Sequence, residues 1–291
     1  MIGGLFSQKK IEIPEAETYR KYVRDYKEGL NGLMESPFWG ALKPHVSSFL
    51  ERPPTVQELW RILDAVWDQM GIETENGDSL KEYYSHPIWL YNGLIVESNP
   101  ICVKTRYEII QLAKKYSPRT VLDLGGGTGI LLKIAHAEIP QADRFDLVDI
   151  SIKWESYVSE GLRPFGRIRA LDHPQPPYDV VLSTEVMEHL RNPFEAISSI
   201  NKFLKPRGVF IGTWSFYPMT RCHLPQNFYL ARIFHNAVAL FGFKLLEKVN
   251  CGSFIFVYEK KRDISQFQST FWEKTFEIGR PFLTFLNRYL P

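Results

Sequence analysis

Four glycines stand within five residues in the segment 121–129, VLDLGGGTG, directly after an apolar run. Glycine has no Cβ, so its backbone adopts left-handed conformations easily and a ligand can approach the peptide atoms closely. The apolar run predicts a strand, and Ile130 opens a helical pattern. A glycine turn from strand to helix is the place where open α/β sheets bind ligands. The segment therefore predicts a ligand site built largely from backbone, with Asp123 beside it.

The glycine spacing narrows the class of ligand. The dinucleotide fingerprint Gly-x-Gly-x-x-Gly fails, because its third glycine would fall on Ile130, which disfavours a nicotinamide-dependent oxidoreductase. The spacing is instead Gly-x-Gly-x-Gly, over Gly125, Gly127 and Gly129. Asp149 closes the next apolar run, where an acid can accept both hydroxyls of a ribose. Its alternative role is to cap a helix that follows it.

A second group of reactive residues follows the predicted strand 178–183. Glu185, Glu188 and His189 have the spacing i, i+3, i+4, which predicts one face of a helical turn, and His223 follows a later strand. Two acids and two histidines could bind Mg²⁺ or Mn²⁺. Without a metal, His223 or His189 could act as a general base, and Glu185 is a further catalytic candidate. Both alternatives stay open.

The elements that must position these residues alternate after residue 117. Short apolar runs separated by helical patterns predict a parallel sheet with crossover helices. Two final β-rich runs around Cys251 and Gly252 predict an antiparallel hairpin, so the fold class is α/β with seven strands, mostly parallel. The predicted strands are 119–124, 144–149, 167–171, 178–183, 208–214, 243–250 and 253–260, and the predicted helices are about 128–138, 151–161, 193–203 and 227–241.

The chain before residue 104 has helical periodicity and predicts an accessory or lid region over 1–103. Thr55 and Glu58 form a capping-box pattern before an apolar stripe that Gly71 would end. The ligand-binding domain is predicted over 104–262. An apolar tail, 263–291, is expected to pack on the body or on a partner subunit, and a homodimer is one outcome. A membrane-surface role is weaker, because the tail lacks basic enrichment.

Composition excludes several function classes. The 291 residues carry a formal charge of +2, which gives no basic stripe for nucleic acid. Three separated cysteines argue against a disulfide framework and fit a reducing compartment. We find no apolar run long enough for a bilayer and no signal-peptide pattern at the start. A cytoplasmic protein is the expectation.

Residues 178–214, YDVVLSTEVMEHLRNPFEAISSINKFLKPRGVFIGTW, carry the most specific pattern. With the glycine motif, they resemble the ubiquinone-biosynthesis-type and related small-molecule members of the class I S-adenosylmethionine (SAM) methyltransferases. The resemblance covers about residues 104–260, and Arg207 replaces the first glycine of the usual Leu-Lys-Pro-Gly-Gly. It implies a Rossmann-like fold and SAM as cofactor. The implied cofactor residues are Gly125, Gly127 and Gly129 for the methionyl part, Asp149 for the ribose, Ile150 and Asp172 for the adenine, and Arg106 for the carboxylate.

The resemblance also implies the reaction. We expect SAM-dependent methyl transfer to a small molecule, as O-methylation of a natural product, a sugar-linked intermediate or a quinone-like intermediate with a histidine base. Small-RNA 2′-O-methyltransferases use a similar pair of acids and histidines for a metal, so metal-assisted transfer through Glu185, Glu188, His189 and His223 is the alternative. A non-catalytic SAM-binding scaffold is the alternative of another class. The aromatic residues expected around the acceptor are Phe38, Trp39, Trp89, Tyr91, Trp214 and Tyr217.

Overall fold

The structure is a computed structural model that describes residues 16–150 and 155–289. Seven strands form one sheet in the order β3-β2-β1-β4-β5-β7-β6. The strands from β1 to β5 run parallel to one another, and β7 runs antiparallel to both β5 and β6, as predicted. The bounds are β1 Thr120–Leu124, β2 Arg144–Val148, β3 Ile168–Ala170, β4 Tyr178–Thr184, β5 Leu204–Thr213, β6 Phe243–Asn250 and β7 Phe254–Lys260.

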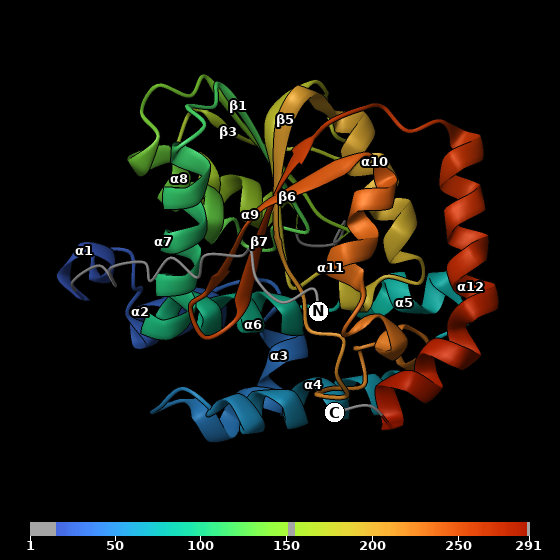
Figure 1. Cartoon of the computed structure of the whole chain (residues 1–291). Coiled ribbons are helices and arrows are strands. Elements are labelled where there is room, and N and C mark those ends of the chain that lie inside the picture. The colour runs from blue at the N-terminus through green and yellow to red at the C-terminus, as the bar shows by residue number, and fades with distance from the viewer. Residues whose placement is uncertain (1–15, 151–154, 290–291) are drawn as a thin grey trace.

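Helices cover both faces of the sheet (Figure 1). On one face lie α7 (Pro100–Lys114), α8 (Ile130–Glu138) and α9 (Glu155–Leu162). On the other face lie α10 (Pro193–Phe203), α11 (Phe234–Ala237) and α12 (Gln266–Tyr289). The single helix predicted over 227–241 is broken into the 3₁₀ helix η3 (Pro225–Leu230), α11 and the 3₁₀ helix η4 (Val238–Phe241). The predicted start of α9 at residue 151 lies outside the described residues.

Six accessory helices precede α7; most of them lie below the sheet in Figure 1, whereas α1 lies to the left, near α7. Their bounds are α1 Ala16–Arg20, α2 Tyr26–Met34, α3 Trp39–Val46, α4 Val56–Met70, α5 Gly77–Tyr84 and α6 Ile88–Ser98. The capping box predicted for α4 forms reciprocally between Thr55 and Glu58, and Gly71 ends the helix in left-handed conformation with φ 61°. Asp25 caps α2, which begins as a helix separate from α1.

The accessory helices share a hydrophobic core with the sheet. Buried side chains of α4 and α6, such as Val66 and Leu94, belong to the same cluster as Val121 of β1 and Ile134 of α8. The domain boundary predicted between residues 103 and 104 falls inside α7. Because one core spans this boundary, the position of the accessory helices depends on the sheet.

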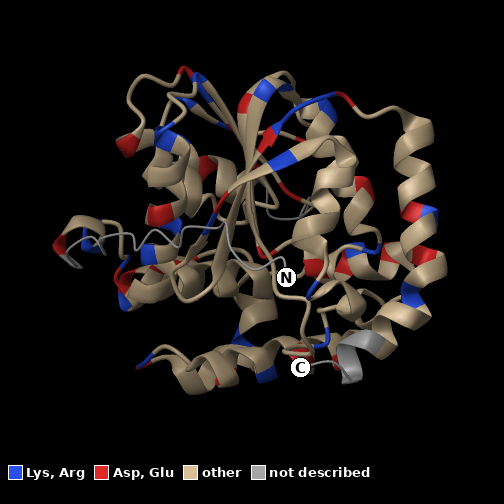
Figure 2. Cartoon of the chain, viewed as in Figure 1, with Lys and Arg blue, Asp and Glu red and all other residues tan. Residues whose placement is uncertain are grey.

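The apolar tail forms α12, and one face of it packs on the body. Phe276 stacks on Phe194 of α10, with ring centroids 4.5 Å apart. The opposite face exposes a stripe of apolar side chains: Phe267, Phe271, Ile278, Phe282 and Phe285. No described helix is both long enough and apolar enough to cross a bilayer. Figure 2 shows basic and acidic residues intermixed along the described elements, consistent with the nearly balanced charge.

We predict that Phe241→Ala will lower the free energy of unfolding by about 3–5 kcal/mol, because it leaves a cavity in the core. The Phe241 ring is fully buried and stacks on Phe194 at 5.1 Å. Urea denaturation measures the loss. Phe267→Ala is the control, since that ring is 80% exposed, and we expect it to change stability by less than about 0.5 kcal/mol. Equal losses in the two variants would contradict the packing described here.

Candidate active site

A cavity of about 1770 Å³ opens at the carboxyl ends of the parallel strands. Its wall combines the turn after β1 and the ends of β2 and β4 with side chains of the accessory helices, among them Trp60, Tyr84 and Trp89. Ligand pockets are commonly about 300–1,000 Å³, so this cavity has room for two molecules side by side. A cofactor and an acceptor can therefore occupy it together.

The glycine turn adopts the backbone that the sequence predicts. Gly125, Gly127 and Gly129 have φ of 76°, 55° and 79°, in the left-handed region that side chains other than glycine rarely occupy. A Cβ on Gly127 would meet nothing within 4 Å, so its peptide faces open space in the cavity wall. Gly129 does not line the cavity. It begins α8 beside Leu162, which makes its role the turn itself.

Asp149 lies at the end of β2 and holds the glycine turn. Its Oδ2 accepts a hydrogen bond from the Gly127 N–H at 2.8 Å. The next described helix begins only at Glu155, and Ser151, the start expected for it, lies outside the described residues. Ile150 and Asp172 also line the cavity, so the predicted cofactor residues on β2 and after β3 come together on one wall.

Asp123 is a buried acid beside a cation. Its side chain is 1% exposed, and neither carboxylate oxygen has a hydrogen-bond partner among the described residues. Burial raises the pKa of Asp123 to about 7, with Arg106 opposing the rise and Asp149 adding to it. Arg106 and Asp123 both line the cavity. An unpaired buried carboxylate is costly, so this pair favours a ligand that carries a cationic group near an anionic one.

Glu188 and its neighbours form the second part of the site. Glu188 Oε1 accepts from the Ser215 N–H at 3.1 Å, whereas the buried Oε2 has no hydrogen-bond partner among the described residues. Burial and the nearby Glu185 carboxylate raise the pKa of Glu188 well above its ordinary value. The group is therefore held protonated unless a cation replaces its proton.

Two histidines lie against this acid with their Nδ1 atoms on backbone carbonyls. His189 Nδ1 is 3.0 Å from the Cys222 carbonyl, and His223 Nδ1 is 2.9 Å from the Tyr217 carbonyl. Burial, with His223 adding to it, lowers the pKa of His189 to about 4, and burial also lowers the pKa of His223. Both rings are then neutral at pH 7, and because a carbonyl only accepts, Nδ1 carries the hydrogen and Nε2 the lone pair.

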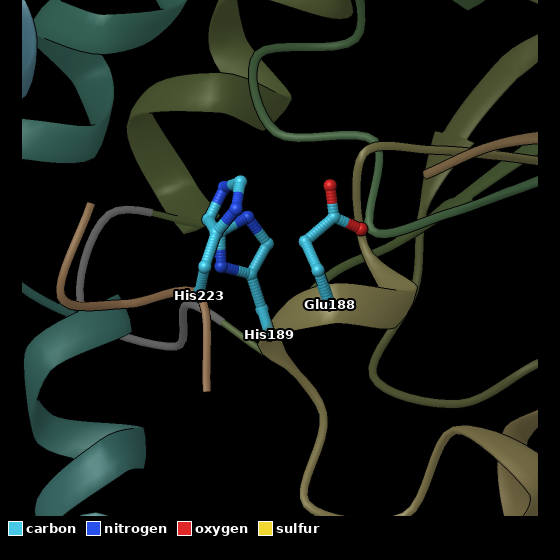
Figure 3. A group of neighbouring side chains, drawn as sticks. All are labelled: Glu188, His189 and His223. Carbon is cyan, nitrogen blue, oxygen red and sulfur yellow. The ribbon is translucent and has the colours of Figure 1, made fainter. Parts of the chain in front are cut away.

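The two imidazoles and the acid form a three-residue group (Figure 3). The ring centroids of His189 and His223 are 4.9 Å apart. One ligand atom from each of Glu188, His189 and His223 lies within 4.8 Å of the others. Three of the four residues predicted from the sequence make up this group, and Glu185 is not among them. Glu185 precedes the 3₁₀ helix η2 (Met187–His189) with φ 53°, and its N–H donates to the Thr213 carbonyl. It lines the cavity but stands outside the group.

The accessory region supplies an aromatic wall that the sequence revealed only in part. Tyr84 and Trp89 contact the His189 ring, with centroids 5.7 and 6.1 Å away. The Tyr84 hydroxyl donates to the Cys222 carbonyl that His189 also contacts. Of the six aromatic residues expected around the acceptor, Trp89 lines the cavity, whereas Phe38, Trp39, Tyr91, Trp214 and Tyr217 do not. Trp214 stacks on Phe256 at 4.6 Å instead, and Tyr84 was missed because helical spacing does not distinguish it from a core tyrosine.

We predict that Asp123→Asn will make stability less dependent on pH. The pKa of Asp123 is raised above its unfolded value of 3.8, so its contribution favours folding below about pH 4 and is lost as pH rises towards 7. Between pH 4 and pH 8, the free energy of unfolding of the variant should rise by on the order of 4 kcal/mol relative to that of the wild-type chain. Urea denaturation across this range measures it, with Asp78→Asn at the exposed start of α5 as the control. If the difference in free energy of unfolding between the wild-type chain and Asp123→Asn did not vary with pH, the burial of this acid would be contradicted.

Comparison with known proteins places this geometry in a family. Residues 104–248 match the methyltransferase-domain family. The malonyl-[acyl-carrier protein] O-methyltransferase of Halalkalibacterium halodurans is 27% identical over 169 residues, which cover 53% of this chain and 60% of that protein. The ubiquinone biosynthesis O-methyltransferase of Caulobacter vibrioides is 33% identical over 101 residues, or 32% of this chain and 40% of that protein. The chain thus spans about half the length of these curated relatives.

A solved structure supports the fold. Human N-acetylserotonin methyltransferase in complex with SAM has a TM-score of 0.51 and 14% sequence identity, and the match covers 80% of this chain and 70% of that one. The mostly parallel sheet of seven strands, the glycine turn after β1 and the acid after β2 are the features that the sequence resemblance led us to expect. Residues 104–248 are a methyltransferase domain, and the chain belongs to the class I SAM-dependent methyltransferases.

Proposed function

We propose that this protein transfers the methyl group of SAM to a hydroxyl oxygen of a small-molecule acceptor. The observation that carries the proposal is that the glycine turn with Asp149 and the neutral His223 line one cavity, which has room for both molecules. When bound, SAM supplies an electrophilic methyl group on a sulfonium that is its own leaving group. The protein then has to align the acceptor, exclude water and remove one proton.

The cavity residues fit the cofactor. Arg106 and Asp123 both line the cavity and influence each other electrostatically, and together they offer a cation and an acid for the carboxylate and ammonium of a zwitterionic methionyl group. Asp149 has the position to accept the ribose hydroxyls, and Ile150 and Asp172 would contact the adenine. Gly125 and Gly127 expose backbone in the same wall. In this proposal Gly129 contributes the turn rather than a contact.

We propose His223 as the general base. Its Nε2 carries a lone pair because Nδ1–H donates to the Tyr217 carbonyl, and that same bond would stabilise the imidazolium formed when the acceptor proton moves to Nε2. His189 is a weaker base, since its pKa is lowered to about 4. His223 would accept the hydroxyl proton at Nε2 as the acceptor oxygen receives the methyl group that SAM supplies. Glu185 lines the same cavity as His223.

The acceptor is proposed to have an aromatic or apolar body. Trp60, Tyr84 and Trp89 line the part of the cavity contributed by the accessory helices. Such a wall suits a natural product, a sugar-linked intermediate or a quinone-like ring. The two bacterial relatives are O-methyltransferases by name, which supports oxygen as the methylated atom. The expected homodimer stays a prediction, and the exposed stripe of α12 is the surface available to it.

A metal-assisted reaction is the second candidate, favoured by one observation. Glu188, His189 and His223 bring three ligand atoms within 4.8 Å, and Glu188 Oε2 lacks a hydrogen-bond partner among the described residues. Carboxylate and imidazole are ligands of Mn²⁺, and carboxylate of Mg²⁺. These three residues would hold the ion, which would supply a positive charge that lowers the pKa of the acceptor hydroxyl. A non-catalytic SAM-binding scaffold is the third candidate, which product formation would exclude.

We predict that Asp149→Ala will weaken SAM binding at least about 10-fold, because bonds between a carboxylate and ligand hydroxyls are lost. Isothermal titration calorimetry measures the dissociation constant. The control is Asp143→Ala, an exposed acid just before β2 that pairs with Arg119. Unchanged affinity would remove Asp149 from the cofactor site, and absence of SAM binding by the wild-type chain would refute the proposed function.

His223→Ala should lower kcat by about 100-fold or more while SAM affinity changes little, because a general base acts only in the chemical step. Mass-spectrometric detection of a methylated product measures turnover, and His235→Ala is the control, because this ring stacks on Phe256 of β7 and does not line the cavity. A chelator, followed by added Mg²⁺ or Mn²⁺, separates the candidates. Loss of activity that the ions restore would favour the metal, and no effect would favour His223 alone. Equal effects on kcat and on SAM affinity would contradict both.

A further inference from the structure

The glycine turn contains one side chain through which a neighbouring element can hold it. In the segment 125–129, Thr128 is the only residue that is not glycine. Glycine loses more backbone freedom on ordering than other residues. Holding such a turn in one conformation therefore costs more conformational entropy. Asp149 restrains it at the Gly127 N–H, on the side of the cavity. A second restraint acts through Thr128, from the opposite direction.

That restraint is Glu97, in the last turn of α6. The Thr128 hydroxyl donates to Glu97 Oε1 at 2.8 Å. Lys133 Nζ, one turn into α8, is 3.0 Å from the same oxygen, and Arg24 binds Oε2 at 3.2 Å. The Arg24 N–H also donates to the Glu97 carbonyl at 2.9 Å. The Glu97 side chain is only 3% exposed, so its charge depends on these partners.

Gly93, one turn before Glu97 on the same helix face, allows the contact. A Cβ at this position would lie 2.3 Å from Thr128 Cγ2 and 2.9 Å from its hydroxyl oxygen. Real Cβ atoms do not approach other atoms so closely, and α6 would have to move away from the turn. Gly93 and Glu97 together therefore make a surface of α6 that is shaped to receive Thr128. Two segments far apart in the sequence meet at this one side chain.

We propose that Glu97 is a positioning residue for the cofactor: it holds Thr128, and through it the glycine turn, in the conformation that binds SAM. This inference rests on the proposed function. The accessory helices are then part of the cofactor site as well as a cover for the acceptor. Holding the turn before SAM arrives reduces the ordering that binding would otherwise require, so loss of the restraint weakens binding without removing any atom that contacts the cofactor.

The first test measures the turn without cofactor. In Glu97→Gln, hydrogen exchange of the peptide that covers residues 125–129 should be at least about fivefold faster than in the wild-type chain. Glu138→Gln is the matched control. That carboxylate binds Tyr22, Gln111 and Lys21 in a similar network, but at the far end of α8 from the turn. Both variants can lose global stability, and only Glu97→Gln should speed exchange in the turn. Equal exchange in the turn would overturn the proposal.

The second test measures SAM affinity by calorimetry. Glu97→Gln and Thr128→Val should each weaken binding by about tenfold, the double variant should be no weaker than the worse single one, and Thr128→Ser, which keeps the hydroxyl, should restore binding. Additive losses, or failure of Thr128→Ser to restore affinity, would contradict a restraint through the hydroxyl. Gly93→Ala should also weaken binding, whereas Gly161→Ala on α9, where a Cβ meets nothing within 4 Å, should not.

The outcomes distinguish this inference from the proposed function. If the wild-type chain bound no SAM while exchange in the turn still depended on Glu97, the proposed function would fail and the restraint would stand. If the wild-type chain bound SAM and Glu97→Gln bound it equally well, the proposed function would survive and the positioning role would be refuted.

Discussion

The turn between β1 and α8 must pass through left-handed backbone at Gly125, Gly127 and Gly129. This constraint determines much of the site. Because only glycine adopts that backbone readily, the turn exposes peptide groups and has almost no side chains to hold it. Neighbouring elements therefore have to restrain it from outside. Asp149 does so from the end of β2, and Glu97 does so from α6. The proposed cofactor site is thus assembled from three separate parts of the chain.

Burial by the accessory helices also determines the protonation of the reactive groups. Tyr84 and Trp89 cover His189, and the lowered pKa of that histidine follows mainly from its removal from water. The same loss of water raises the pKa of Glu188 and of Asp123. A site that keeps its imidazoles neutral and its acids partly protonated is suited to accept a proton or a cation. The region expected to be a lid therefore also contributes to the acid–base state of His189.

The two faces of the sheet are covered differently. One face shares its core with the accessory helices, whereas the other packs on α10, α11 and one side of α12. The other side of α12 keeps its phenylalanines exposed. The exposed stripe lies on a different part of the molecule from the Glu97 contact, so self-association through α12 and restraint of the cofactor turn are physically independent questions.

The sequence by itself determined the sheet, the glycine turn and the family, because these depend on local patterns. Alternating apolar runs indicate strands, and the spacing Gly125, Gly127, Gly129 requires left-handed backbone wherever the chain folds around it. The capping box at Thr55 was equally local. Only the tertiary structure decided which side chains meet. Glu185 was expected in a helical turn with Glu188, but the chain turns at residue 185 before the 3₁₀ helix begins. Glu97 reads in the sequence as an ordinary acid at a helix end, and its role depends on a contact across 31 positions that no spacing rule reveals.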